Sequence, residues 1–237
     1  MNNKGNLYLI PNVVAEHTAD QVIHPFVKEQ LKTISHFLAE DIRTARRFLS
    51  SLKIYPSIES LNFSVLNKDT SEDELDSLMK PLLDGNNLGV VSESGCPGVA
   101  DPGAIAVAYA HQSEIRVIPL VGPSSILLAL MASGLNGQHF AFHGYLPVDA
   151  HEASKAIKAF ERESKTKSQT QIFIETPYRN NQLYANLIKT LEPGTHLCIA
   201  VDITGNDEFI QTKRVSDWKR LKIEWPKLPA VFLFLAP

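Results

Sequence analysis

The sequence predicts an α/β protein built from two α/β domains, with a mostly parallel sheet in the first and a mixed sheet in the second. Short apolar runs alternate with segments whose apolar residues recur every three or four positions, as expected for strands joined by crossover helices. The length of 237 residues suits two small domains. The last three apolar runs follow one another without a predicted helix, which indicates a mixed second sheet. We expect the domains to be residues 1–121 and 122–237.

Five apolar runs and four helical segments make up the first half. The helix that opens at Ser71 has a capping box, because Glu74 lies three residues after Ser71, and the following leucines share one face. Asp101 and Pro102 are expected as N-cap and first residue of a later helix. In order, we expect the strand Leu7–Ile10, a helix through Val27, Leu31 and Ile34, the strand His36–Ala39, the helix Thr44–Leu52, the strand Phe63–Leu66, the helix after Ser71, the strand Leu88–Val91, the helix Ala104–His111 and the strand Arg116–Val121.

The second half opens with Gly122-Pro123-Ser124-Ser125 and a helix, Ile126–Ala132. This helix is apolar on all sides, so we expect it to be buried on every side. Helices are also expected near Ala153–Glu163 and Leu183–Leu191. The predicted strands are Phe140–Phe142, Gln171–Ile174, Leu197–Ile203, Phe209–Arg214 and Val231–Leu235.

Composition limits the partners and the cellular location. The chain has 23 basic and 26 acidic side chains, a net charge of −3, so no overall positive field attracts nucleic acid and any RNA contact must be local. The candidates are the segment Arg43–Arg47 and the basic series Lys155, Lys158, Arg162, Lys165 and Lys167, although such a series is usually a solvated face.

The apolar run near the N-terminus is too short for a signal peptide or a membrane span, and the two cysteines, Cys96 and Cys198, form no metal-ligand or disulfide pattern. We therefore expect a cytoplasmic protein without a metal or a membrane partner.

The segment Val90–Gly103 is the best candidate for a ligand site. It joins a buried strand to a helix, and open α/β sheets bind ligands outside the carboxyl ends of their strands. Its glycines and small residues allow close approach of the backbone, while Pro97 and Pro102 stiffen the loop. The segment matches neither the G-x-G-x-x-G nor the P-loop pattern, so a different ligand is expected.

The same segment carries a family resemblance. Residues 92–103, Ser-Glu-Ser-Gly-Cys-Pro-Gly-Val-Ala-Asp-Pro-Gly, resemble the S-D-A-G-T-P-G-I-S-D-P-G signature of the rRNA small subunit methyltransferase I branch of the tetrapyrrole methylase superfamily. Other resembling segments follow in the family's order: Leu7–Asn12, Ala39–Thr44 (A-E-D-T-R), Gly122–Ser125 (P-G-P-S-A), Ala132–Leu135 (S-G-L), Phe142–Pro147 (F-x-G-F-L-P), Ile174–Arg179 (Y-E-S-P-H-R) and Ala200–Thr204 (A-R-E-L-T).

The resemblance implies two domains with an interdomain cofactor cleft, a homodimer, and S-adenosylmethionine as the cofactor. Val99 and Val201 would form an apolar rim over the adenine, and small hydroxyls would bind the polar ends. The implied cofactor-binding residues are Pro11, Ser94, Gly95, Cys96, Val99, Ser124, Ser125, Glu175, Val201 and Thr204.

Some segments depart from the branch that the chain resembles. The glycine expected after Pro11 is absent, Val148–Glu152 replaces basic residues, and Val201–Gly205 replaces R-E-L-T-K. These departures affect the substrate side more than the cofactor side. Three function classes stay open: an RNA ribose 2′-O-methyltransferase, a methyltransferase on a tetrapyrrole or other small molecule, and a non-catalytic protein that binds S-adenosylmethionine.

Carboxylates and arginines near the motifs are the candidate catalytic groups. Glu40, Asp41 or Asp101 could serve as general base for a ribose hydroxyl, and Arg43 and Arg179 could hold phosphates from the two halves. Alternatively, Asp101 is only an N-cap, and Arg43 forms a surface pair with Glu40 or Asp41. Cys96 has no recognisable base, and the eight histidines are expected as surface or packing residues.

Overall fold

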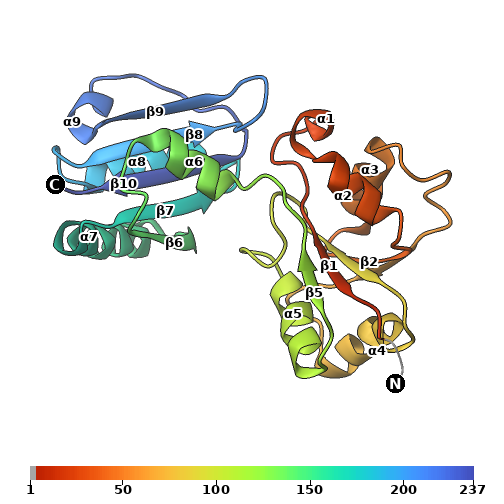
Figure 1. Ribbon diagram of the computed structural model, residues 1–237. Coiled ribbons are helices and arrows are strands. Elements are labelled where there is room, and N and C mark those ends of the chain that lie inside the picture. The colour runs from red at the N-terminus through yellow and green to blue at the C-terminus, as the bar shows by residue number, and fades with distance from the viewer. Residues whose placement is uncertain (1–3) are drawn as a thin grey trace. The chain divides into compact units, whose positions relative to one another are not determined.

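The computed structural model describes residues 4–237 and divides into two compact units, Met1–Ser124 and Ser125–Pro237, here called the N-terminal and C-terminal units (Figure 1). Each unit contains a five-stranded sheet with helices. The predicted boundary at residues 121 and 122 lies in the same connection as the observed division. No helix within residues 4–237 is long and apolar enough to cross a membrane.

The N-terminal unit has a wholly parallel sheet with strand order β3-β2-β4-β1-β5. Its elements are β1 (Leu7–Ile10), α1 (Ala19–Val22), α2 (Pro25–Leu31), β2 (His36–Ala39), α3 (Ile42–Ser51), β3 (Asn62–Val65), α4 (Glu72–Leu83), β4 (Leu88–Val91), α5 (Gly103–Gln112) and β5 (Val117–Pro119). The chain leaves β2 towards β3 on one side and leaves β4 towards β5 on the other. This divergence is a topological switch point, where parallel α/β sheets bind ligands.

Both faces of the three central strands are buried, which explains why β1, β2 and β4 are nearly continuous apolar runs. Successive residues alternate between two core clusters: Phe37 packs with α2 and α3, whereas Leu38 packs with α4 and α5. The same alternation is seen at Leu7 and Tyr8. Every strand predicted in this half is present; the bounds of β1, β2 and β4 are as predicted, and those of β3 and β5 differ by one or two residues.

The two predicted helix starts have different outcomes. At α4, Ser71 and Glu74 form both hydrogen bonds of the capping box, as predicted. At α5, the prediction that Asp101 is the N-cap is wrong, because the N-cap is Pro102. The Asp101 carboxylate instead accepts hydrogen bonds from the backbone N–H groups of Gly98 (3.0 Å) and Gly103 (2.7 Å), so it braces the loop as well as the first helical residue.

The C-terminal unit has the predicted mixed sheet, with order β6-β7-β10-β8-β9, in which only β6 and β7 pair in parallel. A short helix between the last two strands was missed by the sequence analysis, because four residues carry too little periodicity to be recognised. The elements are α6 (Ser125–Ser133), β6 (Phe140–Tyr145), α7 (Ala150–Lys167), β7 (Thr170–Glu175), α8 (Asn180–Thr190), β8 (His196–Val201), β9 (Phe209–Arg214), α9 (Val215–Trp218) and β10 (Ala230–Leu235).

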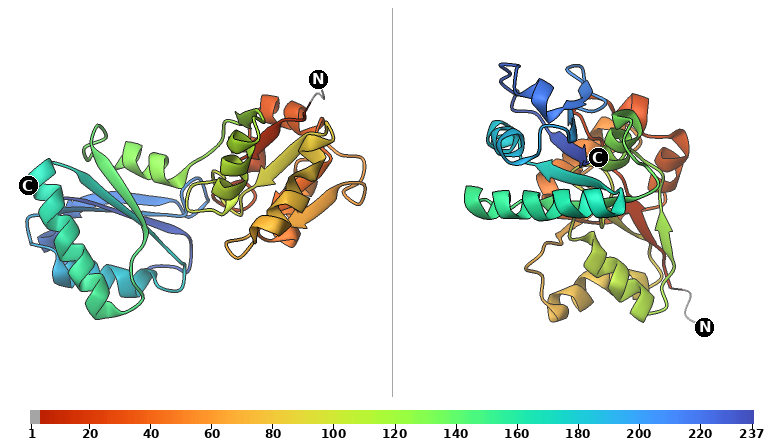
Figure 2. Two further views of the ribbon diagram at one scale, coloured as in Figure 1. Left: turned by 90° about the horizontal axis from the view of Figure 1, so that it is seen from below. Right: turned by 90° about the vertical axis from the view of Figure 1, so that its left-hand side faces the viewer.

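The prediction that the helix now called α6 is buried on every side is wrong. The helix lies on one side of the mixed sheet, with α7 and α8 on the other side (Figure 2). Ala129 and Leu130 are buried, whereas Leu127 is 51% and Met131 is 78% exposed. An apolar sequence shows only that a helix can be buried without an energetic cost. Which of its sides are buried depends on the elements that pack against it.

Candidate functional site

The loops that follow β1, β4 and β5 are joined at the carboxyl edge of the parallel sheet. The buried side chain of Asn12 donates hydrogen bonds to the carbonyl oxygens of Ser92 (3.0 Å) and Glu93 (3.1 Å), and its backbone N–H donates to Gly95 (2.9 Å). Asn12 was missed as an organising residue, since nothing local distinguishes it from an ordinary loop asparagine. The interactions fix the first loop against the candidate ligand loop.

Gly122 and Cys96 hold the loop after β5 against the loops that follow β1 and β4. A side chain at Gly122 would overlap the ring of Pro11, so this close approach requires glycine. The thiol of Cys96 lies 3.4 Å from the carbonyl oxygen of Pro123. Burial raises the pKa of the Cys96 thiol, which disfavours the thiolate that a nucleophile would need.

The predicted cofactor residues Pro11, Ser94, Gly95, Cys96 and Val99 therefore lie on loops held together at one edge of the N-terminal unit. Ser94 Oγ donates to the carbonyl of Val13 (3.4 Å), and Val99 is 48% exposed. Gly95 and Gly98 have φ of +67° and +79°, in the left-handed region that favours glycine. A valine at Gly98 would thus strain the backbone as well as obstruct a ligand. Loss of ligand binding in Gly98→Val would therefore not distinguish a blocked site from a destabilised fold.

Carboxylates also gather near the switch point. Partial burial, and to a smaller extent the carboxylates of Glu40, Asp41 and Asp101, raise the pKa of Glu93. Asp41 is the N-cap of α3 and accepts hydrogen bonds from Arg43 N–H (2.8 Å) and Thr44 Oγ1 (2.9 Å), which lower its pKa. Asp41 and Asp101 therefore have structural roles, whereas the pKa of Glu93 is raised, which makes its carboxylate a stronger proton acceptor than an ordinary glutamate.

Glu93 was not predicted as a candidate base, although it lies only two residues after the end of β4. Its position at the switch point depends on β4 lying between β1 and β2, which no local pattern reveals. In the described part of the chain no group of three or more His, Cys, Asp or Glu residues could hold a metal ion.

In the C-terminal unit, Glu175 and Arg179 are bonded to each other. Arg179 donates from Nε to Glu175 Oε1 (2.9 Å) and from Nη2 to Oε2 (2.7 Å), and Thr176 N–H also donates to Oε1 (2.7 Å). The Glu175 side chain is 3% exposed and that of Arg179 is 22% exposed. The pair joins the end of β7 to the start of α8. Arg179 is therefore an engaged cation rather than a free one, and its contact with substrate stays a prediction.

Val201 and Glu175 lie at the same edge of the mixed sheet, because both pair with Ala230 of β10. The expectation that the Val201 side chain forms an exposed apolar rim is wrong. That side chain is 1% exposed and belongs to the core cluster on the α7 and α8 side of the sheet. The inward direction follows from the alternation of side chains along β8.

The loop after β8 contains a buried polar atom of a kind that a ligand could satisfy. Thr204 has φ of 71°, and its Oγ1 is buried without a hydrogen-bond partner within residues 4–237. An unsatisfied buried group of this kind costs about 1–3 kcal/mol. The Asp202 carboxylate accepts a hydrogen bond from Asp207 N–H (2.9 Å), and it occupies space that a side chain at position 205 would need. Asp202 and Gly205, which both depart from the R-E-L-T-K pattern, therefore fit each other within this loop.

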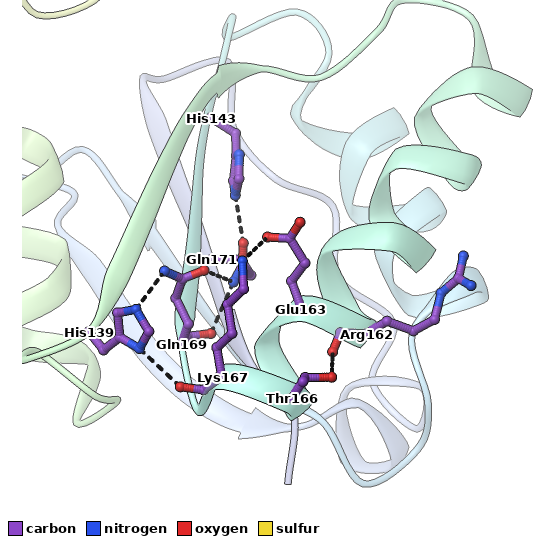
Figure 3. Close-up of polar contacts among 8 residues, drawn as sticks. All are labelled: His139, His143, Arg162, Glu163, Thr166, Lys167, Gln169 and Gln171. Carbon is purple, nitrogen blue, oxygen red and sulfur yellow. Dashed lines mark hydrogen bonds and ion pairs between the residues drawn. The ribbon is translucent and has the colours of Figure 1, made fainter.

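The acidic segment after β6 and the histidines on and near this unit's sheet have structural explanations. Asp149, within a segment that lacks the expected basic residues, is the N-cap of α7 and accepts from His151 and Glu152 N–H groups. Among the histidines, His143 stacks on Phe160 with ring centroids 3.8 Å apart. Figure 3 shows that His143 also bonds Gln171 and that His139 contacts the Lys167 carbonyl and Gln169. His143 is a packing residue and His139 is a surface residue, which are the two roles predicted for the histidines.

Comparisons with known proteins agree with the resemblance in the motifs. No family model matches the chain. The chain is 28% identical over 223 residues to Ribosomal RNA small subunit methyltransferase I of Buchnera aphidicola, covering 94% of this chain and 73% of that protein. The protein of the same name from Escherichia coli O157:H7 is 28% identical, with 91% and 71% covered. That of Streptococcus pyogenes serotype M6 is 32% identical, with 78% and 60% covered.

Solved structures show the same fold. The chain is similar to uroporphyrin-III C-methyltransferase from Thermus thermophilus in complex with S-adenosyl homocysteine, with a TM-score of 0.56, 14% identity, and 98% and 97% of the two chains covered. The native form of that protein gives a TM-score of 0.57 at 13% identity, with the same coverage. Motifs in the family's order, the two α/β units and these relatives together lead to one conclusion: the chain is similar over most of its length to proteins named Ribosomal RNA small subunit methyltransferase I, and it has the fold of the uroporphyrin-III C-methyltransferases.

Proposed function

We propose that this protein is an S-adenosylmethionine-dependent methyltransferase that methylates a ribose 2′-hydroxyl of ribosomal RNA. The observation that carries the proposal is the similarity over most of the chain to proteins named Ribosomal RNA small subunit methyltransferase I. The fold is also that of a methyltransferase solved with S-adenosyl homocysteine, the product of methyl transfer from this cofactor.

The loops at the carboxyl edge of the parallel sheet suit such a cofactor. Exposed Val99 offers apolar contact, Ser94 offers a hydroxyl, and the backbone at Gly95 is open to close approach. When bound, S-adenosylmethionine supplies a methyl group on a positively charged sulfur.

The chain's own groups must then position the acceptor oxygen and remove its proton. Positioning supplies much of the rate acceleration in such a transfer, and no metal is needed. Glu93 is the carboxyl group best suited to accept the hydroxyl proton, because its pKa is raised and it borders the switch point. Glu40 stays an alternative acceptor, whereas the carboxylates of Asp41 and Asp101 are engaged in capping and in bracing the loop.

A second candidate is methylation of a tetrapyrrole or other small molecule. The solved structures with the same fold carry the name uroporphyrin-III C-methyltransferase, which favours this class. The sequence relatives favour RNA, and their identity to this chain is about twice as high. A non-catalytic protein that binds S-adenosylmethionine is the third class.

Calorimetry and RNA mapping test the proposal. The purified chain is expected to bind S-adenosylmethionine and S-adenosyl homocysteine, and a ribose methylation in small-subunit rRNA should vanish from cells that lack the gene. Val99→Asp should weaken cofactor binding about tenfold or more, since an apolar contact worth roughly 1.5–3 kcal/mol is replaced by a charge. Val65→Asp is the matched control, because Val65 has a similar exposed fraction but is the last residue of β3 and lies outside the candidate ligand loop.

Three outcomes would count against this function. Absence of heat with both compounds in a folded sample would remove the cofactor assignment. An unchanged rRNA methylation map would favour the small-molecule methyltransferase or the non-catalytic class instead. Equal losses in Val99→Asp and Val65→Asp would show that the ligand loop is misassigned.

We also propose a homodimer that works in the cytoplasm. Support for the dimer is the apolar surface on α6, where Met131 is 78% exposed, as such side chains are often covered by a partner. Support for the cytoplasm is the rRNA substrate class together with two free cysteines. Sedimentation should give twice the monomer mass at micromolar concentration, and Met131→Lys should shift the mass towards monomer. A wild-type protein that sediments only as monomer would contradict the dimer.

A further inference from the structure

Helix α3 exposes an uninterrupted row of arginines. Its sequence, IRTARRFLSS, contains three arginines and no acidic residue. Ala45, Phe48 and Leu49 face the core, while Arg43, Arg46 and Arg47 are exposed on the opposite side. This local excess of positive charge stands in a chain with a net charge of −3.

The arrangement is unfavourable for the isolated helix. Arg43 lies three and four residues before Arg46 and Arg47, and like charges at these spacings repel by about 0.2–0.5 kcal/mol per pair. Arg43 is also in the first turn, where the helix dipole disfavours a cation. None of the three arginines forms an ion pair with another residue of the described chain, 4–237. An anionic partner would offset these unfavourable terms.

Neighbouring groups hold part of the row in position without neutralising it. The Arg46 guanidinium lies 5.2 Å from the centre of the Phe63 ring, which keeps the cation at the surface. Two carboxylates lie near the row without forming an ion pair with it. Arg46 contributes to lowering the pKa of Glu59, whose carboxylate is bonded to Ser57, and Arg43 contributes to lowering the pKa of Asp41, whose carboxylate caps α3. Arg46 and Arg47 also line an open groove of about 470 Å³, together with apolar and hydroxyl side chains and one acidic residue, Glu59.

The second basic series, on α7, differs from the row on α3 because acidic residues pair with some of its cations. It has five cations, but Glu152, Glu161 and Glu163 lie on the same helix. Lys155 is paired with Glu152 at 2.9 Å, and Lys167 is paired with Glu163 at 3.3 Å; the latter contact is visible in Figure 3. This helix has the mixed charge of an ordinary solvated face.

We propose that the exposed face of α3, defined by Arg43, Arg46 and Arg47, binds backbone phosphates of the RNA substrate next to the nucleotide that is methylated. This inference rests on the proposed function. Helix α3 begins directly after β2, at the carboxyl edge that carries the candidate site, so Arg43 lies nearest to that edge and Arg46 and Arg47 one turn further along. Arginine suits this partner because its planar guanidinium can bind a phosphate through two parallel hydrogen bonds.

The test measures binding of the full-length protein to protein-free small-subunit rRNA over a range of salt concentrations. Arg46→Ala and Arg47→Ala should each weaken binding about fivefold or more at low salt, and each should reduce the slope of log K against log[salt] by about 0.7–0.9, the contribution of one phosphate. Lys158→Ala and Lys165→Ala on α7 are the matched controls and should change affinity by less than twofold. Binding of S-adenosyl homocysteine should be unchanged in all four variants.

The outcomes separate this inference from the proposed function. Wild-type protein that binds the cofactor and methylates rRNA, with Arg46→Ala and Arg47→Ala binding rRNA as tightly as wild type, would overturn the role of α3 alone. Wild-type protein that binds no cofactor would overturn the proposed function instead. Unchanged binding to free rRNA with weakened binding to the assembled small subunit would identify a ribosomal protein as the partner of this face. Thermal melting of each variant identifies any loss that comes from unfolding.

Discussion

Replacing Arg179 by alanine is expected to lower the free energy of unfolding of the C-terminal unit by about 3 kcal/mol, near the lower limit for breaking a buried ion pair. The substitution leaves the Glu175 carboxylate, which is 3% exposed, without its two guanidinium hydrogen bonds. We expect the lower limit because the Arg179 side chain itself is 22% exposed. Urea denaturation followed by circular dichroism measures the change.

Arg220→Ala is the matched control for this prediction. Arg220 pairs with Asp217 at 3.7 Å, but the two side chains are 79% and 49% exposed, so the loss should stay below about 1 kcal/mol. The double variant Glu175→Gln, Arg179→Met should recover part of the stability, because it removes the uncompensated charge. Equal stability of wild type and Arg179→Ala would show that the pair contributes nothing to folding. Any loss of methyl transfer in Arg179→Ala must therefore be compared with its stability before a substrate contact is inferred.

Replacing Trp218 by alanine should destabilise the C-terminal unit by about 3–5 kcal/mol, the usual range for truncation of a buried aromatic side chain. Trp218 is fully buried, its indole Nε1 donates to the Leu197 carbonyl at 2.8 Å, and its ring lies 6.0 Å from that of Trp225 and 6.2 Å from that of Tyr184. The alanine variant creates a cavity and leaves that carbonyl without its indole donor. The midpoint of thermal or urea unfolding reports the loss.

Two control variants divide this effect into its parts. Trp218→Phe keeps most of the ring packing and loses the indole hydrogen bond, so it should cost clearly less than alanine. Leu221→Ala removes an apolar side chain that is 42% exposed and should change stability little. If Trp218→Ala were no more destabilising than Leu221→Ala, the aromatic cluster would not be the core of this unit.

Much of the fold could be predicted because its signals are local. The capping box at Ser71 and Glu74 lies within four residues, and the three central strands of the N-terminal unit are apolar runs because both of their faces are buried. The ligand loop after β4 could be located for the same reason, since a Gly-rich and Pro-rich segment between a buried strand and a helix is visible without knowledge of the neighbours.

The sequence by itself thus indicated the type of most elements, the mixed character of the second sheet and the resemblance to the rRNA small subunit methyltransferase I family. Only the tertiary structure decided that β4 lies between β1 and β2, which brings Glu93 near Glu40 and Asp41. It also decided that Arg179 is bonded to Glu175, while the arginines of α3 form no ion pair with any residue in the range 4–237. It also decided that Val201 faces the core and that one side of α6 is exposed. The physical reason is range: helix caps and periodicity act over a few residues, whereas burial and ion pairing depend on segments far apart in the chain.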